Sequence, residues 1–121
     1  MRLMSFSLTW PQIIAHEKTV TRRLGWSFLK PGQRFQAVQK GMGLKKGQKV
    51  VRGPVLECIS NQSEELQDIT LCPFRNAFQF NEVVREGFRG MSSEEFIRMF
   101  FNHNHCRPDT IINRIEFRYV L

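Results

Sequence analysis

The sequence has few cysteines and no long apolar run. Its three cysteines, Cys58, Cys72 and Cys106, are an odd number, which does not fit a framework of disulfide bonds. We therefore expect a reducing, cytoplasmic setting. No apolar stretch is long enough to cross a bilayer, and the first residues lack the apolar segment and cleavage site of a signal peptide. Neither a membrane location nor export is expected.

Acidic residues are scarce relative to basic ones. Eleven Asp and Glu stand against eighteen Lys and Arg, which gives a net charge of +7 and a pI near 9.9. A charge of this sign favours polyanionic partners, nucleic acid first, although a protein that merely happens to be basic carries the same charge. Composition alone leaves both interpretations open.

Repeats, low-complexity segments and linkers are also missing from the chain. Its 121 residues fit a single domain, 1–121, and can bury a core without disulfides or a structural metal. Eleven phenylalanines against one tyrosine predict a core filled largely by aromatic rings. No cofactor is expected.

The first half of the chain predicts a strand, a helix and then two further strands. Alternation predicts strands at about residues 3–8 and 34–39, the second of them after a Pro-Gly turn. Thr9 as N-cap and Pro11 in the first turn predict a helix over about residues 10–18. A mobile basic loop over 40–49 then precedes a strand at about 50–60, interrupted at Gly53-Pro54.

The second half predicts helices followed by a final strand. The pattern at 65–71 is weak, and Asn81 is expected to cap a helical turn. Ser92 or Ser93 caps a clearer helix at 91–104, with Glu95 in capping-box position and a buried stripe of Phe96, Met99 and Phe100. The last residues alternate as a strand. These elements favour an α+β domain, a small curved sheet or barrel with flanking helices.

The stretch "KTVTRR" gathers the residues most suited to chemistry. If the preceding helix continues, Lys18 and Thr21 share one of its faces. A lysine beside a hydroxyl eases alkoxide formation or accepts the proton, and the Arg23 guanidinium suits a phosphate or carboxylate. Cations at a helix C-terminus also simply complement its dipole. The residues alone leave this second reading open.

The same stretch resembles the ASCH family, a branch of the PUA-like fold. That family carries the signature G-x-K-x-x-T/E-x-R after its first strand and helix, matched here by Lys18, Thr21 and Arg23, with His16 in place of the glycine. The segments "LKPGQRFQAV", "REGF…SSEEF" and "INRIEFRYV" also look like the family, so the resemblance covers most of the chain. It implies a PUA-like β-barrel of about five or six strands with flanking helices.

The resemblance also implies an activity. Some small ASCH proteins hydrolyse the amide of N4-acetylcytidine with a threonine nucleophile, a lysine and a glutamate. The matching residues here are Thr21, Lys18 and Glu86. Lys18 would activate the Thr21 hydroxyl, which attacks the acyl carbon, and Glu86 would carry the proton to the leaving amine. For Glu86 the alternative is a solvated carboxylate paired with a neighbouring arginine.

Other ASCH proteins are proposed to bind RNA or to cleave single strands of it, which implies a second use of the same residues. Lys18, Arg22 and Arg23 would then hold phosphates. Trp26 or Phe28 would stack on a base unless these rings belong to the core. The basic loop would extend the track through Lys40, Lys45, Lys46 and Lys49.

Two further interpretations need fewer assumptions. His103, His105 and Cys106 form a cluster without a known zinc-ligand spacing, so a polar loop after a helix is the ordinary explanation and no metal is expected. A domain that docks another protein through a phenylalanine-rich face is a third functional class. The predicted partner is RNA or a modified nucleoside.

Overall fold

The computed structural model describes residues 1–40, 47–66, 82–88, 90–104, 107 and 109–121. The helices within these residues are η1 (Ser7–Thr9), α1 (Trp10–Ile14) and α3 (Ser93–Asn104), with one further helical turn at 82–85. The strands are β1 (Arg2–Ser5), β2 (Val20–Arg23), β3 (Arg34–Val38), β4 (Arg52–Glu65) and β5 (Ile111–Tyr119).

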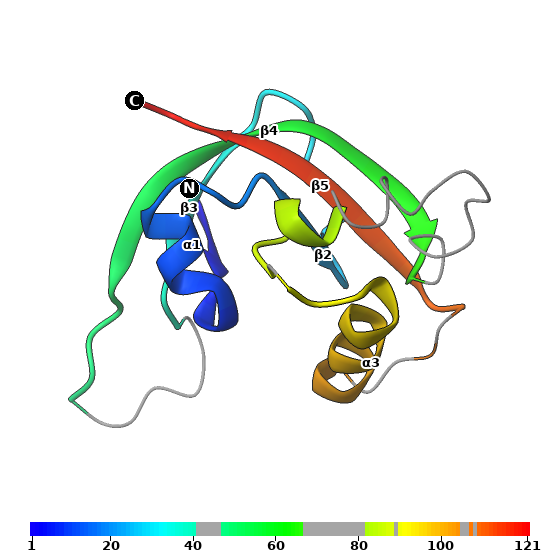
Figure 1. The fold of residues 1–121 in the computed structure, drawn as a ribbon. Coiled ribbons are helices and arrows are strands. Elements are labelled where there is room, and N and C mark those ends of the chain that lie inside the picture. Colours follow the sequence, from blue (N-terminus) through cyan, green and yellow to red (C-terminus); the bar gives the residue numbers. More distant parts are fainter. Residues whose placement is uncertain (41–46, 67–81, 89, 105–106, 108) are drawn as a thin grey trace.

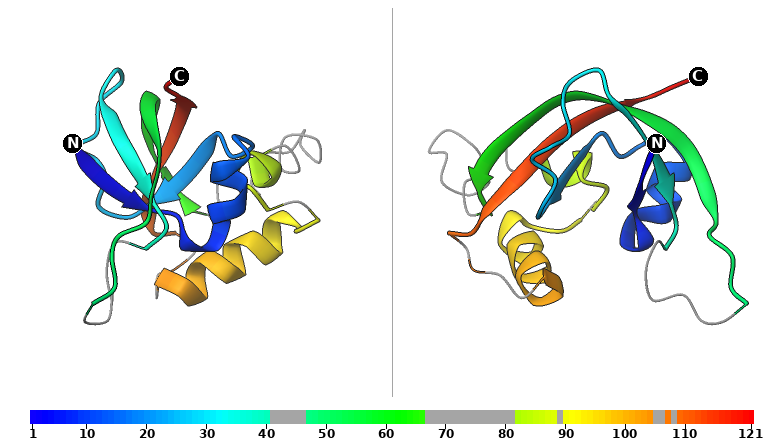
Figure 2. Two further views of the ribbon diagram at one scale, coloured as in Figure 1. Left: turned by 90° about the vertical axis from the view of Figure 1, so that its left-hand side faces the viewer. Right: turned by 180° about the vertical axis from the view of Figure 1, so that it is seen from behind.

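The five described strands form one strongly curled sheet in the order β1-β3-β4-β5-β2. β1 runs parallel to β3, and the other neighbours are antiparallel. The long strands β4 and β5 arch over the molecule, and the two edge strands β1 and β2 lie beneath the arch (Figure 1). The sheet is thus a half-barrel that stays open between β1 and β2, as the views from the side and from behind also show (Figure 2). This architecture confirms the predicted α+β, PUA-like fold.

Two hydrophobic clusters fill the space under the sheet, and phenylalanine is the commonest buried residue in both. The larger joins β1, α1 and the central strands, where Phe35 and Phe117 meet edge to face at 6.0 Å between ring centroids. The smaller packs α3 and the 82–85 turn against β5 through Val83, Phe96 and Ile112. α1 and α3 stand well apart on the concave side (Figure 1). The core thus contains several phenylalanine rings, as expected, but aliphatic side chains make up the larger part of its buried residues.

Several predicted elements match the structure closely. β3 and β5 occupy the expected residues, and β4 contains Gly53-Pro54 and continues beyond the predicted end to Glu65. The capping box of α3 is present: the Glu95 N–H donates to Ser92 Oγ at 3.1 Å, and the Ser92 N–H donates to Glu95 Oε1 at 3.3 Å. The weak segment 67–71, the Asn81 cap and the loop at 41–46 lie outside the described residues.

The prediction for residues 3–23 was wrong in two places. The first strand ends at Ser5, and residues 7–9 form a turn of 3-10 helix. The helix expected to reach residue 18 ends at Ile14, and the unpredicted strand β2 follows it. Lys18 and Thr21 therefore do not share a helix face, because one precedes β2 and the other lies within it.

A left-handed residue ends α1. The His16 N–H donates to the Ile13 carbonyl and the Glu17 N–H donates to the Gln12 carbonyl, which is the bond pattern of a Schellman cap. His16 occupies the left-handed position with φ of 59°, where glycine is the usual residue. His16 also stands where the ASCH signature has its glycine, so a different residue makes the turn that glycine favours.

We expect His16→Val to be less stable than His16→Gly by about 1–2 kcal/mol, because a β-branched side chain strains a left-handed backbone. Both variants lose the imidazole, so the loss of its contacts does not enter their difference. Urea unfolding at pH 7 measures it. Equal midpoints would contradict the role assigned to this position.

Candidate functional site

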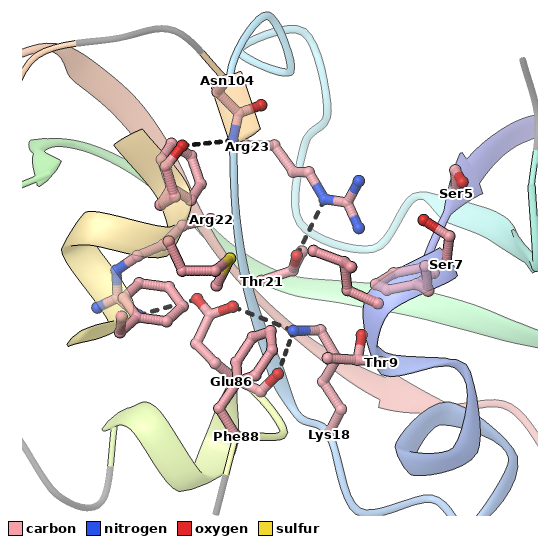
Figure 3. A pocket seen from close by; sticks show the side chains of 15 residues that line it. Ser5, Ser7, Thr9, Lys18, Thr21, Arg22, Arg23, Glu86, Phe88 and Asn104 are labelled. Atoms are coloured by element: carbon pink, nitrogen blue, oxygen red, sulfur yellow. Dashed lines mark hydrogen bonds and ion pairs between the residues drawn. The ribbon is translucent and has the colours of Figure 1, made fainter. Parts of the chain in front are cut away.

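A pocket of about 130 Å³ lies at the opening of the half-barrel (Figure 3). The end of β1, η1, β2, the chain around Glu86 and α3 each contribute to its wall. Phe6 comes from the larger hydrophobic cluster, whereas Phe96 and Phe100 come from the smaller one. The polar residues of the wall are Ser5, Ser7, Thr9, Lys18, Thr21, Arg22, Arg23, Glu86 and Asn104.

Lys18 and Glu86 form a buried ion pair in this wall. Their exposed fractions are 2% and 3%. Lys18 Nζ donates to Glu86 Oε1 at 3.0 Å and also to the main-chain carbonyl of Glu86. Burial lowers the pKa of Lys18 to about 8, against the opposing effect of the Glu86 carboxylate and with a smaller contribution from Arg23.

Arg22 holds the other side of Glu86. Its Nη1 donates to Glu86 Oε2 at 3.0 Å, its Nη2 to Glu82 Oε1 at 2.6 Å and its Nε to Glu64 Oε1 at 2.9 Å. Burial alone would lower the pKa of Arg22, but the three carboxylates outweigh burial and raise it. One buried guanidinium thus joins β2 to β4 and to the turn at 82–85.

A second arginine extends this ionic cluster. Arg114 of β5 donates to both oxygens of Glu82, at 2.7 and 3.1 Å. Burial works against ionisation of Glu82, yet the hydrogen bonds from Arg114 and Arg22 lower its pKa to about 2. Lys18, Arg22 and Arg114 therefore alternate with Glu86 and Glu82, so that these buried charges are paired.

Thr21 and Arg23 project from β2 on the side opposite Arg22 (Figure 3). Thr21 is buried, and its Oγ1 accepts a hydrogen bond of 3.0 Å from Arg23 Nε. The Arg23 guanidinium lies 4.7 Å from the centroid of the Phe6 ring. Burial lowers the pKa of Arg23, but a guanidinium stays protonated at physiological pH. The hydroxyl thus lies beside a permanent positive charge.

A residue of β5 holds the turn that contains Lys18 in place. Tyr119 donates its hydroxyl to the main-chain carbonyl of Lys18 at 2.6 Å, and His16 stacks on the Tyr119 ring at 4.1 Å between centroids. The Thr19 N–H donates to the Arg85 carbonyl and so attaches the Glu86 segment to the start of β2. Sequence analysis did not identify Tyr119 or Glu82 as part of the site, because neither residue belongs to a motif that indicates what it contacts.

The structure brings together five of the predicted site residues: Lys18, Thr21, Arg22, Arg23 and Glu86 all line the pocket. A phosphate contact by Arg22 stays a prediction, and a phosphate would have to compete there with three carboxylates.

The remaining predicted site residues lie elsewhere. Trp26 does not line this pocket and packs against the larger cluster, 6.3 Å from Phe35 between ring centroids. Lys45 and Lys46 of the predicted basic track lie outside the described residues.

Two other sequence expectations concern metals and membranes. Within the part of the chain that the structure describes, no three His, Cys, Asp or Glu side chains come close enough together to hold a metal ion. His105 and Cys106 fall outside that part. None of the described helices is both long enough and apolar enough to cross a membrane.

Comparisons with known proteins agree on the fold. No protein-family model and no curated protein sequence matches the chain. A solved protein of family DUF984 from Enterococcus faecalis V583 is 12% identical with a TM-score of 0.65, over 99% of this chain and 76% of the other. An ASCH domain from Lactobacillus crispatus JV V101 is 15% identical with a TM-score of 0.56, over 98% of this chain and 78% of the other.

These likenesses identify the class of protein. At such identities they establish the fold alone, and that fold is the ASCH-like one that the "KTVTRR" stretch predicted. The chain is thus a small α+β domain with an ASCH-like fold, and it has a buried ionic cluster beside its pocket.

We expect Arg22→Met to lower the free energy of unfolding by about 3–5 kcal/mol, because the variant leaves buried carboxylates without their cation. Arg34→Met is the matched control. Arg34 pairs with Glu57 on the surface with 55% of its side chain exposed, so its loss should cost about 1 kcal/mol or less. Similar effects of the two substitutions on urea unfolding would refute the stabilising role of the cluster.

Proposed function

We propose that this domain binds a modified nucleoside in the pocket and hydrolyses its amide, N4-acetylcytidine being the first candidate. The observation that carries the proposal is the buried Lys18–Glu86 pair, which lines the same pocket as the Thr21 hydroxyl. Lysine, threonine and glutamate in one pocket are the set that the ASCH resemblance implies. The proposed roles are nucleophile for Thr21, base for Lys18 and proton carrier for Glu86.

The hydrogen bonds of Lys18 support its role as a base. A neutral amine has two N–H donors and one lone pair. Two donors of Lys18 are directed at the carbonyl and the carboxylate of Glu86, which leaves the lone pair free to face the pocket. A pKa near 8 makes the neutral form accessible, as a general base requires.

The reaction then proceeds in two stages. Lys18 Nζ takes the Thr21 hydroxyl proton while Oγ1 forms a bond to the acyl carbon, and Arg23 stabilises the developing alkoxide. The C–N bond breaks as the proton passes, with help from Glu86, to the leaving nitrogen of the base. Water then hydrolyses the acyl-threonine ester, releases the acid and restores Thr21.

The size of the pocket supports a small flat reactant. A volume of about 130 Å³ lies below the usual range for whole drug-sized ligands, so the pocket accepts one base with its acyl group and not a longer chain. Phe6, Phe88 and Phe96 supply apolar surface for such a ring. The sugar would then extend toward solvent.

A second candidate function is binding of single-stranded RNA without hydrolysis. Ser7 lines both this pocket and a neighbouring cavity of about 340 Å³, whose wall includes Lys40 and Lys49. A base in the first pocket could therefore continue into a phosphate backbone along the second. The same cleft would then hold RNA as a ligand.

Incubation with N4-acetylcytidine tests the first candidate. We expect turnover by the wild type, a loss of at least about a hundredfold in Thr21→Ala and Lys18→Ala, and retained activity in Thr21→Ser, which keeps a hydroxyl. Loss of the acyl group is followed by chromatography. An inactive wild type that binds single-stranded RNA in a salt-dependent manner would favour the second candidate instead.

The pH dependence tests the role of Lys18. A base acts in its neutral form, so kcat/KM should rise tenfold per pH unit below about 8 and level off above it, following the lowered pKa of Lys18. A pH series of initial rates measures this. A rate that falls as pH rises through 8 would show that the charged form of Lys18 is the active one.

A further inference from the structure

The pocket lies at the open edge of strand β2. Thr21 and Arg23 project from one side of the strand, where Thr21 lies opposite Ile115 of the larger cluster. Arg22 projects from the other side, toward Glu82 and Glu86. All three residues line the same pocket (Figure 3). Side chains of both faces can share a pocket only where that pocket meets the edge of the strand.

The main chain of Arg22 faces this edge. The Phe117 N–H donates to the Thr19 carbonyl, so in the antiparallel pairing with β5 residues 19, 21 and 23 exchange hydrogen bonds. Residues 20 and 22 must then direct their N–H and C=O groups away from β5. Among the described residues, no hydrogen bond is made by these two groups of Arg22.

An unpaired donor and acceptor side by side are suited to recognition. Main-chain groups that face a partly enclosed pocket need a partner, and sheet edges commonly find one in a bound molecule. Arg22 is locked in place by three carboxylates, so the direction of its main-chain groups is fixed before a ligand arrives.

We propose that the N–H and C=O of Arg22 bind the edge of a planar base that carries an acceptor nitrogen next to an N–H donor. This inference rests on the proposed function for the kind of ligand. For a cytosine, the Arg22 N–H donates to ring N3, and the N4–H donates to the Arg22 carbonyl. Because the Arg22 carbonyl lies on the Arg23 side of that residue, an acyl group on N4 extends toward Arg23, whose Nε donates to the Thr21 hydroxyl.

Specificity follows from this pairing. The pocket accepts a secondary amide beside an unsubstituted ring nitrogen, and it rejects a base whose exocyclic nitrogen lacks hydrogen. The rejection has a physical cause, since the Arg22 carbonyl would be buried against an alkyl group without a hydrogen bond. The side chains of the pocket alone would not impose this rule.

Three nucleosides that the enzyme cannot deacylate test the pairing: cytidine, N4,N4-dimethylcytidine and the pyrimidin-2-one riboside, which lacks the amino group. We expect cytidine to bind at least about tenfold more tightly than the other two. Cytidine should also shift the Arg22 amide resonance and slow its hydrogen exchange, as seen by NMR of the ¹⁵N-labelled protein. Equal affinities, an unperturbed Arg22 amide, or no binding of any of the three would overturn the inference.

An ester in the backbone tests the N–H directly while leaving the Arg22 side chain intact. Chemical ligation at Cys58 allows the α-hydroxy analogue of arginine to replace residue 22. We expect cytidine affinity to fall about tenfold in this protein. The matched control is an ester at Val20, whose N–H also faces the edge but which does not line the pocket. Equal losses in both proteins, or none in either, would contradict the proposal.

The two proposals fail in different ways. Cytidine binding that depends on the Arg22 N–H, without turnover of N4-acetylcytidine, would refute the hydrolysis and support the recognition. Turnover of N4-acetylcytidine at an unchanged rate in the residue-22 ester would refute the recognition and support the hydrolysis.

Discussion

Glu86 lies between two buried cations, and much of the site depends on that placement. One carboxylate oxygen accepts from Lys18 and the other from Arg22, at 3.0 Å each. A carboxylate this deep in the protein is stable only when both of its oxygens are paired, which holds the chain around Glu86 against the start of β2. Arg22 also donates to Glu82 and Glu64, so these two carboxylates are held in place by the same buried cation. A shift in any one of these segments would leave a buried charge without its partner.

The opening of the half-barrel is where these charges meet the cavity. Among the described strands β1 and β2 are not joined, so the edges of these two strands face the same region. The larger hydrophobic cluster closes one side and α3 the other, with Phe6 and Phe96 among the residues at the boundary. Burial between them also lowers the pKa of Lys18. The fold thus places a partly enclosed pocket beside a buried ionic cluster and the edge of β2.

Much of this could be predicted where the signal was local. The capping box identified α3, alternation identified β3 and β5, and the order of Lys18, Thr21 and Arg23 indicated an ASCH-like domain. β2 was missed because "VTRR" has no alternating apolar pattern: Thr21 and Arg22 are both buried, one against the core and one among carboxylates. The length of α1 was overestimated because a histidine, and not a glycine, occupies its left-handed cap.

The sequence by itself determined the class of fold and five of the residues that line the pocket, since periodicity, caps and a short motif depend on neighbours in the chain. Only the tertiary structure decided what those residues contact. Arg22 was expected to meet phosphate, yet it pairs with carboxylates 42, 60 and 64 positions away. Its main-chain N–H and C=O are directed away from β5, toward the edge of the sheet in the described strand order. Both outcomes depend on which distant segments pack together, and burial then fixes the partner of each charge.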